Sequence, residues 1–351
     1  MITMKSFSAL DRVFVIAEAG SNWKCGDYSD DLEQAKKLIE TAAKAGADAV
    51  KFQTYKPETI YVSDAGNSDY LEKYGIKENI NEIFEHLSMP YEMIPELKKY
   101  CDEKNIQFMS TPFSVQDAKE VDKFTEIHKV ASFEINHIRL LEFLAKTQKP
   151  IIVSTGASTF KEIDFAINLI RKNGNDNIAL MQCTSKYPCP IDSLNLKTIS
   201  TMGQKYKIPV GLSDHSLDPI IGPITAISLG AKFIEKHFTL DKNLPGPDHP
   251  FALNPDELEL MITSIRNTEK ALGTGIKEIL PVEDELRKFA KRSIQAIQDI
   301  KKGDLLIEGQ NFEILRPGNR LRGMDPLYLD TISGKKSKKD VQKGDGIIDV
   351  E

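Results

Sequence analysis

Cysteine, tryptophan and long apolar runs are all scarce in this chain of 351 residues. Its four cysteines, at positions 25, 101, 183 and 189, have neither the paired spacing of a zinc site nor the density of a secreted disulfide scaffold. Free thiols are therefore expected. The N-terminal stretch lacks the pattern of a secretory signal, and no apolar run reaches the roughly 18 residues of a membrane helix. These absences predict a cytoplasmic protein with no membrane partner.

An excess of basic charge is also lacking. Lysine and arginine number 46 against 52 aspartates and glutamates, which gives a formal net charge of -6. A nucleic-acid partner is not expected, because such a partner requires a basic surface. An anionic ligand would have to be held by a few local cations and oriented N–H groups.

The order of apolar runs predicts a barrel followed by a small module. From residue 13 to about 270, short β-branched or apolar runs alternate with stretches of helical periodicity, such as Asp31 to Lys44. This alternation is typical of βα units around a parallel sheet, and eight such units close a (β/α)8 TIM barrel. The predicted strands are residues 13–19, 48–54, 106–111, 127–132, 151–156, 178–184, 209–214 and 232–238.

Polar residues gather at the ends of the predicted strands. In a barrel these ends and the loops that follow them form one face, where active sites lie. Thr111, Ser132 and Ser154 have an alternative reading as helix N-caps. Glu18 and Lys51 do not, because they lie inside or at the end of buried strands.

His215 and His237 close the seventh and eighth predicted strands. Because neighbouring strands place their ends a few ångströms apart, both imidazoles are expected to bind one divalent metal ion. Mn²⁺ suits two nitrogen ligands completed by oxygen, and the spacing leaves Zn²⁺, Fe²⁺ and Co²⁺ open. Asp214 is a candidate to orient a ring or a metal-bound water. His249 is a weaker third ligand candidate.

Lys51 is expected to direct its ammonium group into this mouth. A lysine among hydroxyl groups suits a phosphorylated or carboxylated ligand. The alternative is a Schiff-base lysine of an aldolase, which the spacing alone leaves open.

Two further segments depart from the regular βα pattern. Residues 55–90 form a long connection at the predicted active face, which we interpret as a lid or substrate-binding loop. After a last barrel helix over Pro255–Leu272, residues 274–288 are predicted to be a linker, so that the barrel domain spans residues 1–273. Residues 289–351 are predicted to be a compact β-rich module, with a near-repeat at 299–304 and 340–345. A module this small buries little surface and is expected to dock on something.

Several ordered motifs run along almost the whole chain. They are AEAGSN (17–22), VKFQT (50–54), STPFS (110–114), ASFE (131–134), STG (154–156), CTSKYP (183–188), GLSDHS (211–216), EKHFTLD (235–241), PGPDH (245–249) and LRPG (315–318). Together these motifs resemble those of the sialic acid synthase family. The module at 289–351 is similar to the antifreeze-like (SAF, β-clip) domain of that family.

The resemblance implies a metal-dependent condensation of phosphoenolpyruvate with open-chain N-acetylmannosamine or a related N-acetylated aminosugar. The C3 carbon of phosphoenolpyruvate attacks the sugar aldehyde, water adds at C2, and phosphate leaves. The product is a nonulosonic acid of the N-acetylneuraminate or legionaminate type.

The resemblance also implies roles for single residues. His215 and His237 match metal ligands, and Glu18 matches a catalytic acid or base. Arg316 matches a catalytic arginine that the C-terminal domain of the partner subunit inserts over the sugar, which implies a domain-swapped homodimer. The positions that match phosphoenolpyruvate contacts are Lys51, Thr111, Ser132, Ser154, Ser185 and Ser213. The positions that match sugar contacts are Gln53, Tyr187 and Asp248.

Two positions depart from the family pattern. Trp23 stands where members commonly have histidine, and it is expected either to stack on the sugar or to pack against the loop. Ser185 stands where many members have asparagine.

A non-catalytic function is a further alternative, in which an inert barrel carries a binding module. The polar residues that face one mouth of the predicted barrel argue against this alternative.

Overall fold

The structure is a computed structural model that describes residues 6–7, 10–67 and 78–351. The chain divides into two compact units, Met1–Gly273 and Thr274–Glu351. Across the described residues, no helix is long and apolar enough to cross a membrane.

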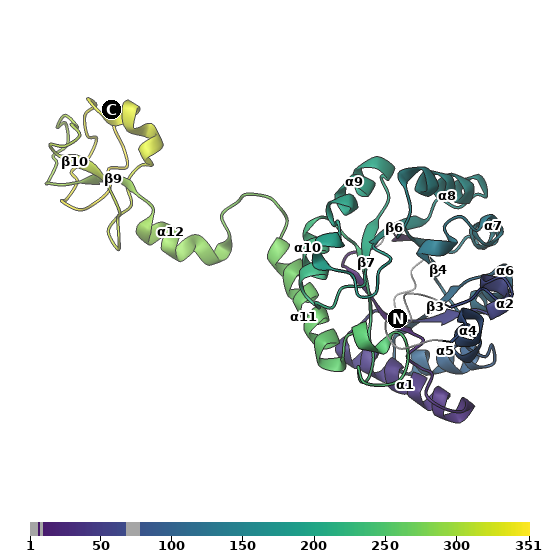
Figure 1. Ribbon diagram of the computed structural model, residues 1–351. Helices are drawn as coiled ribbons and strands as arrows, with labels where there is room; N and C mark the ends of the chain where they lie inside the picture. The colour runs from purple at the N-terminus through teal and green to yellow at the C-terminus, as the bar shows by residue number, and fades with distance from the viewer. Residues whose placement is uncertain (1–5, 8–9, 68–77) are drawn as a thin grey trace. The chain divides into compact units, whose positions relative to one another are not determined.

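The first unit is built on eight parallel strands (Figure 1). Their order is β3-β2-β1-β8-β7-β6-β5-β4, and β3 and β4 lie side by side to complete the circle. The predicted (β/α)8 barrel is therefore confirmed. The strands are β1 (Phe14–Gly20), β2 (Ala49–Thr54), β3 (Gln107–Pro112), β4 (His128–Val130), β5 (Ile151–Ser154), β6 (Ile178–Cys183), β7 (Val210–Asp214) and β8 (Phe233–His237).

The strand β4 is shorter than predicted. It ends at Val130, because Ser132–Glu134 turn into a 3-10 helix instead of continuing the strand. Ser132 consequently lies on a turn above the strand.

Helices surround the strands. The first, α1 (Tyr28–Ala45), begins where the Asp27 side chain accepts hydrogen bonds from two backbone N–H groups, and it ends at Gly46 in the left-handed region with φ 88°. The other large helices are α5 (Met93–Glu103), α6 (Val115–Asp122), α7 (Ile138–Lys146), α8 (Phe160–Lys172), α9 (Lys197–Tyr206), α10 (Ile221–Ser228) and α11 (Pro255–Leu272).

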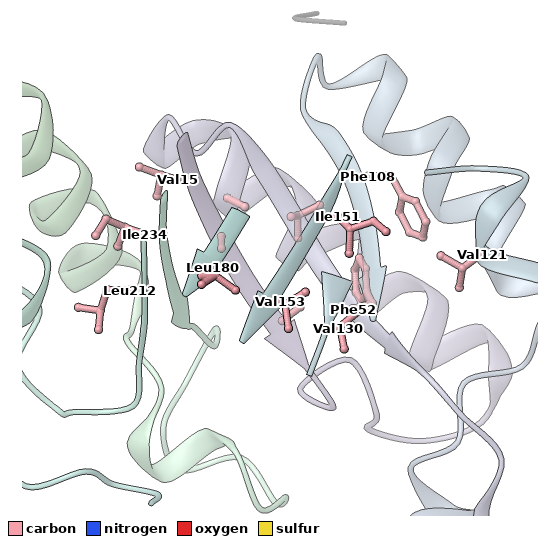
Figure 2. Close-up of a cluster of buried hydrophobic side chains, with 14 of the residues drawn as sticks. Val15, Phe52, Phe108, Val121, Val130, Ile151, Val153, Leu180, Leu212 and Ile234 are labelled. Atoms are coloured by element: carbon pink, nitrogen blue, oxygen red, sulfur yellow. The ribbon is translucent and has the colours of Figure 1, made fainter. Parts of the chain in front are cut away.

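Strand alternation divides the core of the barrel into two layers. Outward residues such as Val15 and Val153 pack against the helices (Figure 2). Inward residues such as Ile16, Ile152 and Phe233 fill the barrel itself. Because side chains alternate along a strand, the next inward positions toward the C-terminal ends face the mouth of the barrel.

The segment 55–90 is more ordered than a simple loop. It contains the short helices α2 (Pro57–Ile60) and α4 (Ile80–His86), while its residues 68–77 lie outside the described part. Tyr55, Ile80, Ile83 and Leu87 form a small apolar cluster of their own. This cluster gives the segment a fixed apolar face.

The second unit combines β structure with short helices. Its strands β9 (Ser293–Ala296) and β10 (Phe312–Leu315) pair antiparallel. The helix α12 (Asp284–Ala290) occupies part of the predicted linker, and α13 (Leu329–Ile332) interrupts the predicted β-rich module. The division of this unit into a linker and a β-rich module stays a prediction.

The near-repeats of the second unit pair with each other. Ile300 and Val341 form an antiparallel bridge. The N–H of Lys302 donates to Asp340 at 2.8 Å, and the N–H of Lys343 donates to Asp299 at 2.8 Å. Equivalent positions exchange equivalent bonds, so the two repeats are related by a local two-fold arrangement.

Candidate active site

A cavity of about 560 Å³ opens at the C-terminal ends of the barrel strands. Arg316 belongs to the second unit of the chain, where its side chain is exposed. All the other residues to which the family resemblance assigns a role line the cavity: Glu18, Lys51, Gln53, Thr111, Ser132, Ser154, Ser185, Tyr187, Ser213, His215, His237 and Asp248.

Two carboxylates and two ammonium groups lie at the floor of the cavity. Lys51 Nζ is 2.5 Å from Glu18 Oε2 and 3.7 Å from Glu235 Oε2. Lys129 Nζ is 3.5 Å from Glu235 Oε1. All four side chains are buried. Strand register explains the arrangement, because Glu18 on β1 lies opposite Lys51 on β2.

Burial and neighbouring charge set the protonation of this floor. Burial raises the pKa of Glu18 to about 7, although Lys51 opposes the shift. Burial disfavours the charged form of Lys51, but the Glu18 and Glu235 carboxylates outweigh it and raise the lysine pKa above its usual range. The floor therefore holds a stable cation beside a carboxyl group able to exchange a proton near neutral pH.

An arc of hydroxyl groups surrounds the floor. Lys51 donates to Thr111 at 3.0 Å, and Lys129 donates to Ser154 at 2.8 Å. Ser213 donates to Glu235 at 3.1 Å. The Gly156 N–H donates to Ser132 at 2.9 Å.

The N-cap reading of Thr111, Ser132 and Ser154 is wrong. The helices that follow them are capped by Ser114, His137 and Thr159. The three earlier hydroxyls are free of that task because each helix starts several residues beyond its strand. They face the cavity instead.

His215 and His237 lie together, with ring centroids 5.6 Å apart. His215 Nδ1 donates to the Thr184 carbonyl at 3.0 Å, which leaves its Nε2 for a ligand. The Tyr187 ring lies over the His215 ring, with centroids 4.1 Å apart.

These two residues fit a divalent metal ion. His237 Nδ1 is buried and has no hydrogen-bond partner among the described residues. In the same part of the chain, no group of three or more histidine, cysteine, aspartate or glutamate side chains could hold a metal. The protein would thus supply two nitrogen ligands and leave the other positions to water or substrate oxygen, as open catalytic sites do.

Two predictions about residues near the mouth are corrected, and for Trp23 the alternative of stacking on the sugar is excluded. Asp214 faces away from the cavity because it alternates with Ser213, and its carboxylate binds Lys236 at 2.8 Å. His249 is not a ligand candidate, since its Nδ1 is hydrogen-bonded to Thr239 at 2.6 Å and the cavity lining does not include it. Trp23 is 1% exposed and packs in the hydrophobic core rather than against the sugar side of the cavity.

Two charged residues of the site were missed by sequence reasoning. Lys129 and Glu235 both line the cavity. The signal was available in the alternation of each strand: Lys129 lies two positions after the inward Ile127, and Glu235 two positions before His237. In these two strands, only the polar residue at the end, Ser132 or His237, had been taken as a site candidate.

A family model described as the NeuB family matches residues 38–277. The chain belongs to this family, that of the sialic acid synthases. The resemblance noted in the sequence is therefore confirmed. In this NeuB-family chain, the matched residues contain the whole cavity lining except Glu18 and Ser21.

Relatives of known name cover nearly the whole NeuB-family chain. Spore coat polysaccharide biosynthesis protein SpsE of Bacillus subtilis is 40% identical over 96% of this chain and 92% of its own. Its crystal structure superposes with a TM-score of 0.64 at 38% identity, covering 96% of this chain and 94% of that chain. Among Campylobacter jejuni proteins, N,N'-diacetyllegionaminic acid synthase is 39% identical over 94% of this chain and 98% of its own. Pseudaminic acid synthase is 36% identical over 97% of both chains.

Proposed function

We propose that this chain condenses phosphoenolpyruvate with an N-acetylated aminosugar to give a nonulosonic acid and phosphate. The observation that carries the proposal is one cavity lined by a buried Lys51–Glu18 pair, an arc of hydroxyl groups and two adjacent imidazoles. The names of the relatives, which include legionaminic and pseudaminic acid synthases, support the product class.

Phosphoenolpyruvate would bind over the floor of the cavity. Its carboxylate and phosphate groups need cations and donors, because the chain as a whole is acidic. Lys51 and Lys129 supply the cations. The hydroxyl donors would be Thr111, Ser132, Ser154, Ser185 and Ser213. The Ser185 hydroxyl is buried without a hydrogen-bond partner among the described residues, which suits a donor kept for a ligand.

The reaction joins C3 of phosphoenolpyruvate to the aldehyde carbon of the open-chain sugar. The aldehyde oxygen takes up a proton, a water molecule adds at C2, and the C2–O bond to phosphate breaks. Glu18 is suited to transfer protons in these steps, since its pKa is about 7. A divalent ion such as Mn²⁺, held by His215 and His237, would supply Lewis acidity toward the aldehyde oxygen.

The sugar would lie against the remaining walls. Gln53, Tyr187 and Asp248 offer polar contacts there. Tyr61, Ile83 and Phe84 from the 55–90 segment add an apolar wall, which suits the methyl group of an N-acetyl substituent. Arg316 would close the site from the partner subunit of a domain-swapped homodimer.

The alternative function, a Schiff-base aldolase, would require Lys51 to react as a neutral amine. The carboxylates of Glu18 and Glu235 raise the pKa of Lys51 and keep it protonated, which opposes nucleophilic attack. Borohydride reduction in the presence of pyruvate would label Lys51 in an aldolase. We expect no label.

The test is phosphate release from phosphoenolpyruvate with Mn²⁺ and a panel of N-acetylated aminosugars. We expect release that requires the metal and one class of sugar, with N-acetylmannosamine and a diacetamido sugar as the first two acceptors. His215→Ala and His237→Ala should each abolish the metal-dependent release while the circular dichroism spectrum stays unchanged. Full activity in either variant would remove the metal site from the proposal.

A further inference from the structure

A buried lysine lies directly behind the two imidazoles. Lys236 on β8 is 2% exposed, and its side chain points away from the cavity because it alternates with Glu235 and His237. Its Nζ donates to Asp214 Oδ2 at 2.8 Å, to the Ser216 carbonyl at 2.5 Å and to the Ser216 hydroxyl at 3.3 Å. The ammonium group of this buried lysine thus binds two residues at the end of the neighbouring strand.

These contacts involve the residues on both sides of one metal-ligand candidate and the residue directly before the other. Asp214 and Ser216 are the residues on either side of His215, and Lys236 directly precedes His237. Asp214 and Lys236 are also register partners across β7 and β8. The ammonium group of Lys236, the residue next to His237, therefore binds the side chain of Asp214 on one side of His215 and the carbonyl and hydroxyl of Ser216 on the other.

The groups around the Asp214–Lys236 ion pair restrict its movement. Asp214 is 1% exposed, and its Oδ1 accepts the Ser216 N–H at 2.8 Å. The start of α10 packs closely on it: a Cβ at Gly222 would come within 2.5 Å of Asp214 Oδ2. The carboxylate is therefore held by the lysine, by a backbone N–H and by a glycine that gives it room.

Stability alone gives a weak reason for such a pair. Removing two charges from water costs several kcal/mol per ion, and apolar replacement of a buried ion pair is often neutral or stabilising. The best-attested use of buried ionic groups is to hold neighbouring parts of the structure in one particular arrangement. In this barrel the two residues of the buried pair are the direct sequence neighbours of the two imidazoles.

We propose that Lys236 is a positioning residue that holds His215 and His237 at the separation required to bind one divalent metal ion. The inference rests on the proposed function, in that His215 and His237 are the metal ligands. Lys236 itself does not touch the ion or the substrates.

The experiment measures Mn²⁺ binding to the full chain without substrates, by calorimetry and by the electron paramagnetic resonance signal of free Mn²⁺. Lys236→Met should weaken Mn²⁺ binding about 10- to 100-fold, the range found when groups that orient metal ligands are removed. The visible absorption bands of bound Co²⁺ should also change, because they report the ligand geometry. Binding of phosphoenolpyruvate without metal should change little.

Two further variants keep the test decisive. Arg266→Met removes the cation of another poorly exposed ion pair, with Asp48 at 2.7 Å, where the chain enters β2 at the opposite end of the barrel. It should lower the melting temperature and leave Mn²⁺ affinity unchanged. The double variant Asp214→Asn with Lys236→Met removes both charges, so it avoids a buried unpaired carboxylate, and it should still lose Mn²⁺ affinity.

The outcomes separate the inference from the proposed function. Wild-type Mn²⁺ affinity in Lys236→Met or in the double variant would overturn the positioning role and leave the metal site standing. An equal loss in Arg266→Met would assign the effect to general destabilisation and also overturn it. Failure of the wild-type chain to bind Mn²⁺ through His215 and His237 would overturn the metal site and the positioning role together.

Discussion

Glu18 lies in contact with a cation, yet its carboxyl group ionises less readily than an exposed one. It is 1% exposed, and the second carboxylate of Glu235 lies in the same floor. Burial and this like charge raise the pKa, while Lys51 and Gln53 oppose the shift. At the scale of a residue, the free energy of burying a charge decides which carboxyl can exchange a proton near neutral pH.

Glu18→Gln should lower kcat about 100- to 10,000-fold, the usual contribution of a general acid or base. The wild-type pH–rate profile should bend near pH 7, the pKa of Glu18, and the variant profile should lack that bend. An unchanged bend in the variant would assign it to another group. Steady-state phosphate release from pH 5 to 9 is the measurement.

The raised pKa of Glu18 also makes the stability of the fold depend on pH. The folded pKa of about 7 exceeds the 4.5 of an exposed glutamate, so folding favours the protonated form. Its contribution to stability is fully present below pH 4.5 and is lost as the pH rises through 7. The melting temperature of Glu18→Gln relative to wild type should therefore increase across that interval.

At the scale of elements, the loops after β4, β5 and β6 converge on one glycine. A Cβ at Gly156 would meet the hydroxyls of Ser132 and Ser185 and the sulfur of Cys183. Ser132 follows β4, Gly156 follows β5, and Cys183 and Ser185 lie at and just after the end of β6. The Gly156 backbone thus approaches two hydroxyls of the arc so closely that a side chain at this position would displace them.

Gly156→Ala should raise KM for phosphoenolpyruvate about tenfold or more, because the new methyl group displaces the hydroxyls by more than hydrogen-bond tolerance. The fold should remain, since serine side chains can rotate away. Steady-state kinetics with each substrate varied in turn is the measurement. Gly203→Ala is the matched control: its Cβ would lie 3.6 Å from Val210, an ordinary contact, and KM should not change. An unchanged KM in Gly156→Ala would exclude the arc from phosphoenolpyruvate binding.

Elements were predictable from the sequence where their signal is periodic. The eight strands and the helix beginning near Asp31 follow directly from apolar spacing. The early end of β4 was not predictable, because the turn at Ser132 depends on packing rather than on a breaker residue. The inward face of Lys129 was predictable from the alternation of its strand, but its ion pair was not, because Glu235 is distant in sequence and only closure of the sheet places it nearby.

At the scale of the whole molecule, the cavity and Arg316 belong to different units of the chain. Every residue that lines the cavity lies before Gly273, whereas Arg316 lies in the unit Thr274–Glu351. Arg316 can therefore act as a lid only if it comes from a second chain or if the two units of one chain meet. The swapped homodimer remains a prediction.

Arg316→Ala should raise KM for the sugar more than KM for phosphoenolpyruvate, because the arginine is predicted to contact only the sugar. Lys338→Ala in the same unit removes an exposed pair with Asp349 and should change neither value. Unchanged sugar kinetics in Arg316→Ala would exclude the lid.

A mixing experiment separates the swapped lid from one in the same chain. Arg316→Ala and His237→Ala chains, each inactive or weak alone, should regain activity when they are unfolded and refolded together. A swapped dimer of the two would contain one site with both native residues. No gain would place the arginine of each chain over its own barrel.

The sequence by itself determined the order and direction of the strands, and thereby which end of the barrel gathers polar side chains. Alternation with a period of two is a local property, so it put Lys51, Ser213 and His237 on the inner face without knowledge of their neighbours. Only the tertiary structure decided the pairings. Closure of the sheet brought Glu235 between two lysines and turned Asp214 toward Lys236, because hydrogen bonds and charge pairs form between strands distant in sequence, where no local pattern reaches.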